Sequence, residues 1–140
     1  MFGTSNDEAK LIITGNNRDV NRYRWNFKNI TNKLKNNKSK QSIVYQNMCN
    51  LLNIRKKQKA FHPNASRHNI NLGSKIFSFK RTSINKEQTI ICITNLSSKF
   101  QTAGLNRIYH NWNNLIGSKI EIKNKLLILK PYETIWLSNK

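Results

Sequence analysis

Acidic side chains are scarce in this sequence, and their scarcity limits the chemistry that the chain can perform. Only 6 of the 140 residues are Asp or Glu, against 25 Lys and Arg, which gives a formal net charge of +19. Reactions that need a pair of facing carboxyl groups therefore have few candidates. The acidic residues are Asp7, Glu8, Asp19, Glu87, Glu121 and Glu133.

Cysteine is scarce as well, and no spacing typical of a metal site is present. Cys49 and Cys92 lie far apart in the chain, which indicates neither a disulfide framework nor a zinc site. We expect two buried, reduced thiols in a cytoplasmic protein. His62, His68 and His110 lack the i, i+4 spacing of paired ligands. Since the sequence also contains no Gly-rich phosphate loop, G-x-S-x-G elbow or H-E-x-x-H motif, we expect no metal and no cofactor.

Long apolar runs are missing too. No stretch of 18 apolar residues occurs, so no transmembrane helix is expected. The N-terminus has neither the basic region nor the apolar core of a signal peptide. The sequence therefore predicts a cytoplasmic protein without a membrane partner.

Positive charge is abundant but evenly distributed. Residues 1–65 hold 13 basic and 3 acidic side chains, and residues 66–140 hold 12 and 3. A pI near 10.4 would ordinarily suggest a polyanionic partner. A nucleic-acid binder usually concentrates its charge on one face or segment, so the even spread argues against that function. A small basic protein that binds nucleic acid through its Lys/Arg surface and exposed aromatic residues stays the alternative interpretation.

Helical periodicity dominates the first half of the chain. A short helix is expected over 5–13, an irregular loop over 16–26, and a helical segment around Phe27, Ile30 and Leu34. Residues 40–58 show the strongest helical pattern, and Pro63 prevents its continuation. The apolar residues that fall on one arc of this helix are Val44, Tyr45, Met48, Cys49, Leu51 and Leu52.

From residue 66 the apolar period changes from about 3.6 to about 2, which predicts strands. The expected strands are 67–72, 75–83, 88–95, 99–103, 118–123, 125–130 and 132–138. Short strands at this spacing favour an antiparallel β-sandwich. Because helices precede strands, we predict an α+β chain of two units, with a boundary near residues 64–67.

One polar cluster stands out in the helical half. Arg18 and Arg22 flank Asp19 and Asn21 in the segment NRDVNRY at 17–23. Guanidinium and amide groups in fixed positions can donate hydrogen bonds to hydroxyls or to an anion. A surface loop whose side chains satisfy one another is the competing interpretation.

Three separated blocks of the sequence resemble one enzyme family. Residues 3–7 (GTSND) and 14–22 (TGNNRDVNR) are similar to the end of the barrel in sucrose phosphorylases, which belong to glycoside hydrolase family 13, the α-amylase family. Residues 51–65 (LLNIRKKQKAFHPNA) resemble the last barrel helix and the turn that leaves it. Residues 111–117 (NWNNLIG) and 127–137 (LILKPYETIWL) resemble a turn and the final strands of the C-terminal β domain. The segment FHPN at 61–64 looks closest to the branch that includes glucosylglycerate phosphorylases.

The resemblance implies a C-terminal piece of a retaining glucosyl-transferring enzyme of carbohydrate metabolism. Residues 1–63 would be the end of a (β/α)8 barrel, comprising the loop after the last strand and the final helix, and residues 66–140 the antiparallel β domain. The family's aspartate nucleophile and glutamate acid/base would lie upstream, and no acid of this chain aligns with them. We therefore expect no catalytic residue here and no activity of the isolated chain.

One substrate-binding element carries over by resemblance. Arg22 corresponds to the second arginine of the family's R-D-(I/V)-N-R motif, which hydrogen-bonds glucose. Arg18, Asp19 and Asn21 would form the supporting loop, while Tyr23 stands where relatives commonly have His. Sugar and phosphate would bind only within a complete barrel, supplied by a missing N-terminal half. A further interpretation takes the β region as a separate carbohydrate-binding module.

Overall fold

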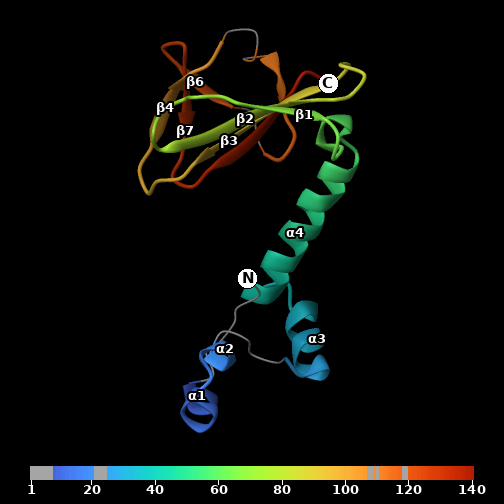
Figure 1. Ribbon diagram of the computed structural model, residues 1–140, viewed down its shortest axis with the longest axis vertical. Helices are drawn as coiled ribbons and strands as arrows, with labels where there is room; N and C mark the ends of the chain where they lie inside the picture. Colours follow the sequence, from blue (N-terminus) through green and yellow to red (C-terminus); the bar gives the residue numbers. More distant parts are fainter. Residues whose placement is uncertain (1–7, 21–24, 107–108, 110, 118–119) are drawn as a thin grey trace. The chain divides into compact units, whose positions relative to one another are not determined.

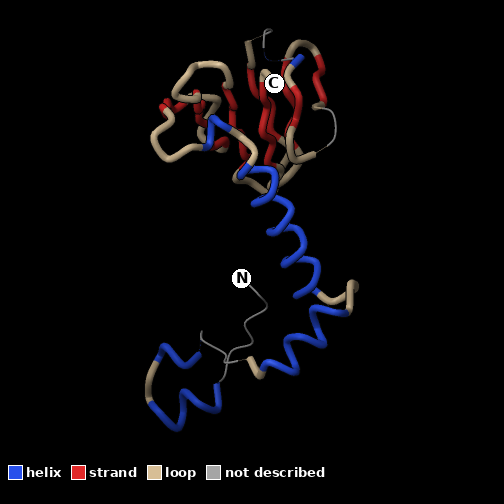
Figure 2. The backbone as a smooth tube through the Cα atoms, turned by 90° about the vertical axis from the view of Figure 1, so that its right-hand side faces the viewer, coloured by secondary structure: helices blue, strands red, loops and turns tan. Residues whose placement is uncertain are grey.

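The computed structural model describes residues 8–20, 25–106, 109, 111–117 and 120–140. The chain divides into two compact units, Met1–Leu52 and Asn53–Lys140. Every described strand lies in the second unit and follows the described α-helices in the chain. Figure 2 colours the helices blue and the strands red. The described part is thus an α+β structure with antiparallel sheets, as the change of period at residue 66 predicts.

Four α-helices lie in the N-terminal part of the chain. They are α1 (Glu8–Thr14), α2 (Asn17–Val20), α3 (Phe27–Lys35) and α4 (Lys40–Lys56), which extends into the second unit. The Asn26 side chain caps α3 by accepting hydrogen bonds from the backbone N–H groups of Lys28 and Asn29. The buried Ser42 Oγ donates to the Leu34 carbonyl at 2.9 Å and thereby fixes the turn between α3 and α4.

The strongest helical prediction is confirmed in position but not in burial. Residues 40–58 are predicted to be helical, and α4 covers Lys40–Lys56. The expected apolar arc, however, is largely exposed, since Val44, Tyr45, Met48 and Leu52 are each 38 to 50% exposed. About half of the surface of these four side chains therefore stays exposed.

The second unit is a two-layer sandwich. Sheet A has the strand order β1-β2-β3-β8-β5, and sheet B the order β4-β7-β6. Figure 1 labels β1, β2 and β3 of sheet A and the three strands of sheet B. The strands are β1 (Ser66–Asn69), β2 (Ile76–Thr82), β3 (Thr89–Asn95), β4 (Gln101–Gly104), β5 (Asn113–Asn114), β6 (Glu121–Lys123), β7 (Leu126–Leu129) and β8 (Thr134–Ser138). All pairings are antiparallel among the described strands. The seven predicted strands are confirmed in place, except that residues 118 and 119 of the predicted strand 118–123 lie outside the described residues. The short β5 is an addition.

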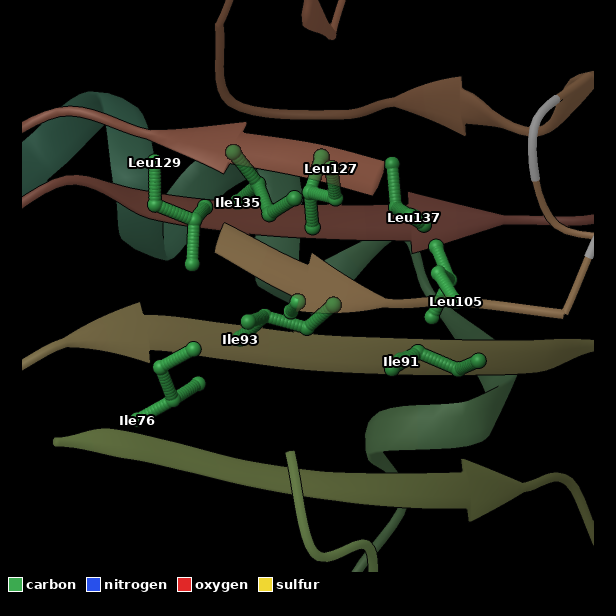
Figure 3. Packing of buried hydrophobic residues seen from close by; sticks show 9 residues of the cluster. Ile76, Ile91, Ile93, Leu105, Leu127, Leu129, Ile135 and Leu137 are labelled. Carbon is green, nitrogen blue, oxygen red and sulfur yellow. The ribbon is translucent and has the colours of Figure 1, made fainter. Parts of the chain in front are cut away.

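The core lies between the two sheets because side chains alternate along each strand. Ile91 and Ile93 of β3 pack with Leu127 and Leu129 of β7 (Figure 3). All four side chains are completely buried. Strand β3 is apolar on both faces, because Ile90 and Cys92 pack beneath the 3₁₀ helix η1 (Lys59–Phe61) on the opposite face of sheet A. A strand covered on both faces reads as a continuous apolar run, as IICI does here.

A buried amide ties the two sheets together at one end. Asn95, at the end of β3, is fully buried. Its Nδ2 donates to the carbonyls of Lys99 at 2.7 Å and Lys130 at 2.9 Å, and its Oδ1 accepts from the Ser97 N–H at 2.9 Å. Because Lys130 follows β7, this side chain spans from sheet A to sheet B.

Neighbouring leucines on β7 provide a test of this core. Leu127 is completely buried, whereas Leu126 is 39% exposed. We expect Leu127→Ala to lower the free energy of unfolding by about 2–5 kcal/mol, because it leaves a cavity between the sheets. Leu126→Ala should cost less than about 1 kcal/mol. Urea unfolding followed by circular dichroism measures both, and equal losses would contradict the placement of the core.

Candidate functional site

The segment predicted to bind sugar begins with a well-defined helix end. Gly15 has a φ of 63° and its N–H bonds the Leu11 carbonyl at 2.7 Å, which is the left-handed termination typical of glycine after a helix. The Asn16 side chain then accepts from the Arg18 N–H at 3.0 Å and starts α2. The predicted irregular loop over 16–26 is thus wrong in part, because this cap allows one short helix within it.

The structure locates only part of the predicted arginine cluster. Arg18 lies in α2 with an exposed side chain, and the backbone of Asp19 belongs to the same helix. Asn21, Arg22 and Tyr23 lie outside the described residues. The assignment of Arg22 to a glucose subsite therefore stays a prediction.

Two carboxylates of the β domain line one small hollow. Glu121 and Glu133 are among the residues around a cavity of about 60 Å³, which holds no more than a few water molecules. Glu133 Oε2 already accepts the Lys130 N–H at 2.8 Å. A hollow of this size cannot admit a glycosidic bond with a sugar ring on each side. Glu121 and Glu133 therefore do not form a glycosidase pair across this hollow.

A polar network joins the segment after α4 to the outer face of sheet A. Arg81 on β2 donates to three backbone carbonyls, those of Ala60 at 3.0 Å, His62 at 2.6 Å and Ala65 at 3.2 Å. Gln88 Oε1 accepts the Ala60 N–H at 3.0 Å. Because Ala60 is fully buried, these bonds replace the water that its peptide groups lose.

The same Gln88 reaches further along the chain. Its Nε2 donates to Gln58 Oε1 at 2.7 Å and to Ser138 Oγ at 3.3 Å. Beside this network, the ring of Phe61 contacts that of Trp136 edge-on, with centroids 4.9 Å apart. Sequence reasoning missed this network, since 28 residues separate Gln88 from Ala60 and no local pattern links them.

Charged and thiol groups near the network are structural in character. Glu87 Oε2 lies 3.1 Å from Lys59 Nζ and 3.7 Å from Lys140 Nζ. Hydrogen bonding and attraction from Lys59, with further contributions from Asn85 and Lys140, lower the pKa of Glu87. Burial raises the pKa of the Cys92 thiol to about 12, so that it stays protonated and unreactive near neutral pH.

Two apolar surfaces lie open in the described parts. The first is the arc of α4 formed by Val44, Tyr45, Met48 and Leu52. The second lies on the outer face of sheet A at Phe77 and Phe79 of β2. Phe77 is 46% exposed, and the centroids of the two rings are 5.5 Å apart. Exposed apolar groups that are contiguous in this way typically mark surfaces covered by other polypeptide.

Comparisons with known proteins identify what the chain is similar to. It is 24% identical over 140 residues to glucosylglycerate phosphorylase of Escherichia coli strain K12, covering 98% of this chain and 24% of that protein. It is 22% identical over 151 residues to glucosylglycerate phosphorylase of Spirochaeta thermophila, covering 99% of this chain and 26% of the relative. The resemblance to this phosphorylase group is confirmed. The chain spans about a quarter of the length of these relatives.

Solved structures support the fold. A family GH13_31 enzyme aligns with a TM-score of 0.54 at 21% identity, covering 86% of this chain and 20% of that enzyme. The alpha-glucosyl transfer enzyme XgtA aligns with a TM-score of 0.59 at 15% identity over 79% of this chain and 19% of its own length. A mutant of MUTB, from crystals soaked with trehalulose, gives 0.59 at 19% identity over 77% of this chain and 19% of its own.

Two further searches gave negative findings. No family model matches the chain. Within the described residues, none of the helices combines the length and the apolar character needed to cross a membrane.

The polar network can be tested at Gln88, which is only 7% exposed. We expect Gln88→Leu to lower the free energy of unfolding by about 1–3 kcal/mol, because the Ala60 N–H would lose its acceptor without regaining water. Gln101→Leu is the matched control. Gln101 is less buried than Gln88, and its side-chain amide donates a hydrogen bond to the Ser97 hydroxyl instead of accepting one from a buried backbone N–H. Urea unfolding of both variants measures the difference, and an unchanged Gln88→Leu protein would refute the role of the network.

Proposed function

We propose that this chain is the C-terminal portion of a sucrose-phosphorylase-like glucosyl-transferring enzyme and is catalytically incomplete alone. The observation that carries the proposal is the match of nearly the whole chain to only a quarter of two glucosylglycerate phosphorylases. The described acids add support, because the pair that shares a hollow has no room for a sugar linkage.

The two parts of the chain have different tasks in this proposal. Residues 1–63 complete a (β/α)8 barrel, with α4 as its final helix, and residues 66–140 form the C-terminal β domain. Arg22 donates hydrogen bonds to glucose, while Arg18, Asp19 and Asn21 hold the loop that carries it. Retaining glycosyl transfer requires a nucleophilic carboxylate and an acid/base carboxyl about 5 Å apart. Both groups come from upstream polypeptide, and the assembled enzyme works in the cytoplasm.

The open apolar surfaces are consistent with such an upstream partner. The curated relatives are about four times as long as the part that this chain matches. Barrel polypeptide would cover the arc of α4, and apolar area removed from water contributes about 25 cal/mol per Å² to that association. The polar network of Arg81 and Gln88 fixes the residues after α4 on sheet A.

A chimaera tests the proposed activity and the role of Arg22. The 140-residue chain replaces the matching quarter of the E. coli phosphorylase, and release of glucose phosphate from glucosylglycerate and phosphate is measured. We expect turnover by the chimaera and none by the isolated chain. Arg22→Ala should lower kcat/KM by about 10–100-fold, because charged hydrogen bonds to the sugar are lost.

The control for this experiment is Arg24→Ala, which removes the same charge two residues further along. It should leave kcat/KM within about twofold of the unmodified chimaera, since the resemblance assigns no sugar contact to this position. Turnover by the isolated chain would refute catalytic incompleteness. Equal losses in the two arginine variants would refute the assignment of Arg22.

The covering of α4 is tested in the same chimaera. Met48 is 50% exposed in this chain, yet the proposal places it against barrel polypeptide. Met48→Glu should therefore abolish soluble, active chimaera, because an unpaired carboxylate is costly to bury. Asn50→Glu, on the opposite side of the helix, should retain activity. Solubility and turnover are measured for both, and a fully active Met48→Glu chimaera would contradict the proposed cover.

A further inference from the structure

The residues that line one groove on the second unit have no role in the proposed function. It has a volume of about 490 Å³ and is lined by strands β1 and β2 and by the turn that follows β2. Small-molecule sites typically have volumes of about 300–1,000 Å³. The side chains around it include Asn64, Ser66, His68, Lys80, Thr82 and Lys86.

The strand register brings these groups together. Ser66 pairs with Thr82, and His68 with Lys80, as antiparallel Cα partners. Side chains of paired residues project from the same face of a sheet, so the two pairs form adjacent rows. This face is the one that carries the buried Ile76 and Ser78 further along β2. Along β2 the inner face of sheet A thus passes from the buried core to an open groove, whose lining includes the exposed Ile84 beside the polar groups.

The turn after β2 contributes the second lysine. The Lys86 N–H donates to the Ser83 carbonyl at 2.8 Å, and Lys86 has a φ of 59°. Ser83 is buried, and its Oγ accepts from the Gln88 N–H at 3.0 Å. These bonds hold the turn, and with it Lys86, at the edge of the groove.

The charge in the groove is not compensated by the surrounding described residues. Among the described residues that line it, none is acidic. Glu87 is the carboxylate next to Lys86 in sequence, but it pairs with Lys59 and Lys140. Lys80 is half-buried and takes part in none of the ion pairs found in the described parts of the chain. The Ser66 hydroxyl donates to the Thr82 carbonyl and the Thr82 hydroxyl bonds that of Thr89. The two ammonium groups, beside the Asn64 amide, are therefore the main donors, and they favour a compact, multiply charged oxyanion.

We infer that this groove binds a phosphate group, either as inorganic phosphate or as the phosphate of a small sugar ester. Lys80 and Lys86 supply the charge, and Ser66, Thr82 and Asn64 supply polar contacts around it. The volume leaves room for a sugar beside the phosphate. The inference rests on the β domain alone and does not depend on the proposed enzymatic function.

Calorimetric titration of the 140-residue chain at low ionic strength tests this site. The probes are inorganic phosphate, glucose 6-phosphate and unphosphorylated glucose. We expect saturable binding of the two phosphate compounds with a Kd of about 1 mM or lower, and none of glucose. Tighter binding of glucose 6-phosphate would identify an ester as the ligand, and equal binding would identify the phosphate group alone. Binding of glucose equal to that of glucose 6-phosphate would overturn the inference.

Paired variants separate a site from general attraction to a basic protein. Lys80→Gln with Lys86→Gln should weaken phosphate binding by at least about tenfold, because both charge-assisted contacts are lost. Lys75→Gln with Lys99→Gln removes the same charge outside the groove and should change binding by less than about twofold. Equal losses in the two double variants would overturn the site.

Folding and the competing polyanion are controlled separately. Circular dichroism establishes that each double variant is folded. If the variant with both Lys80→Gln and Lys86→Gln misfolds, Lys86→Gln alone tests the site, because Lys86 lies in an exposed turn. A single-stranded oligonucleotide serves as a third anion. If it bound more tightly than both phosphate compounds and lost affinity equally in both double variants, diffuse attraction would replace the proposed site.

Discussion

Buried peptide groups without water must find partners, and this requirement determines how the end of the helical part is attached to the sandwich. The residues around Ala60 lie on the outer face of sheet A, where their N–H and carbonyl groups have no strand to pair with. Gln88 and Arg81 provide the partners, with bonds of 2.6 to 3.2 Å. Phe61 can then pack on Trp136 and cover Ile90 and Cys92. Strand β3 is consequently buried on both faces, and it is the strand around which both apolar clusters form.

This attachment covers only part of sheet A, and the uncovered part is informative. Phe77 stays open beyond the reach of η1, and the apolar arc of α4 is open as well. Apolar surfaces that stay exposed in the folded chain are typical of sites where another polypeptide packs. The curated relatives, of which this chain matches about a quarter, contain that additional length. A chain with two open apolar surfaces is therefore consistent with one part of a longer protein.

The large positive charge has different consequences in different places. At Glu87, two lysines converge on one carboxylate and lower its pKa, so that the ends of the β domain are held by local pairing. In the groove beside β1 and β2, Lys80 and Lys86 face polar side chains without a lining carboxylate among the described residues. Lys and Arg are spread evenly along the sequence, but in the folded chain Lys59 and Lys140 pair with a carboxylate whereas the groove that Lys80 and Lys86 line has none in its lining.

Apolar periodicity is a local property of each segment, so the α+β class, the position of α4 and the places of seven strands could be predicted from the sequence. The sequence also determined the resemblance to the phosphorylase group, through blocks that keep their order along the chain. It did not reveal the cap by Asn16 that inserts α2, nor the two-residue β5, since both depend on a few hydrogen bonds rather than on a repeated pattern. Only the tertiary structure decided that Gln88 meets Ala60, that Asn95 ties the sheets, and that His68 and Ser66 lie opposite Lys80 and Thr82. Such contacts join residues far apart in the sequence, and they form only when the strand register brings them to one place.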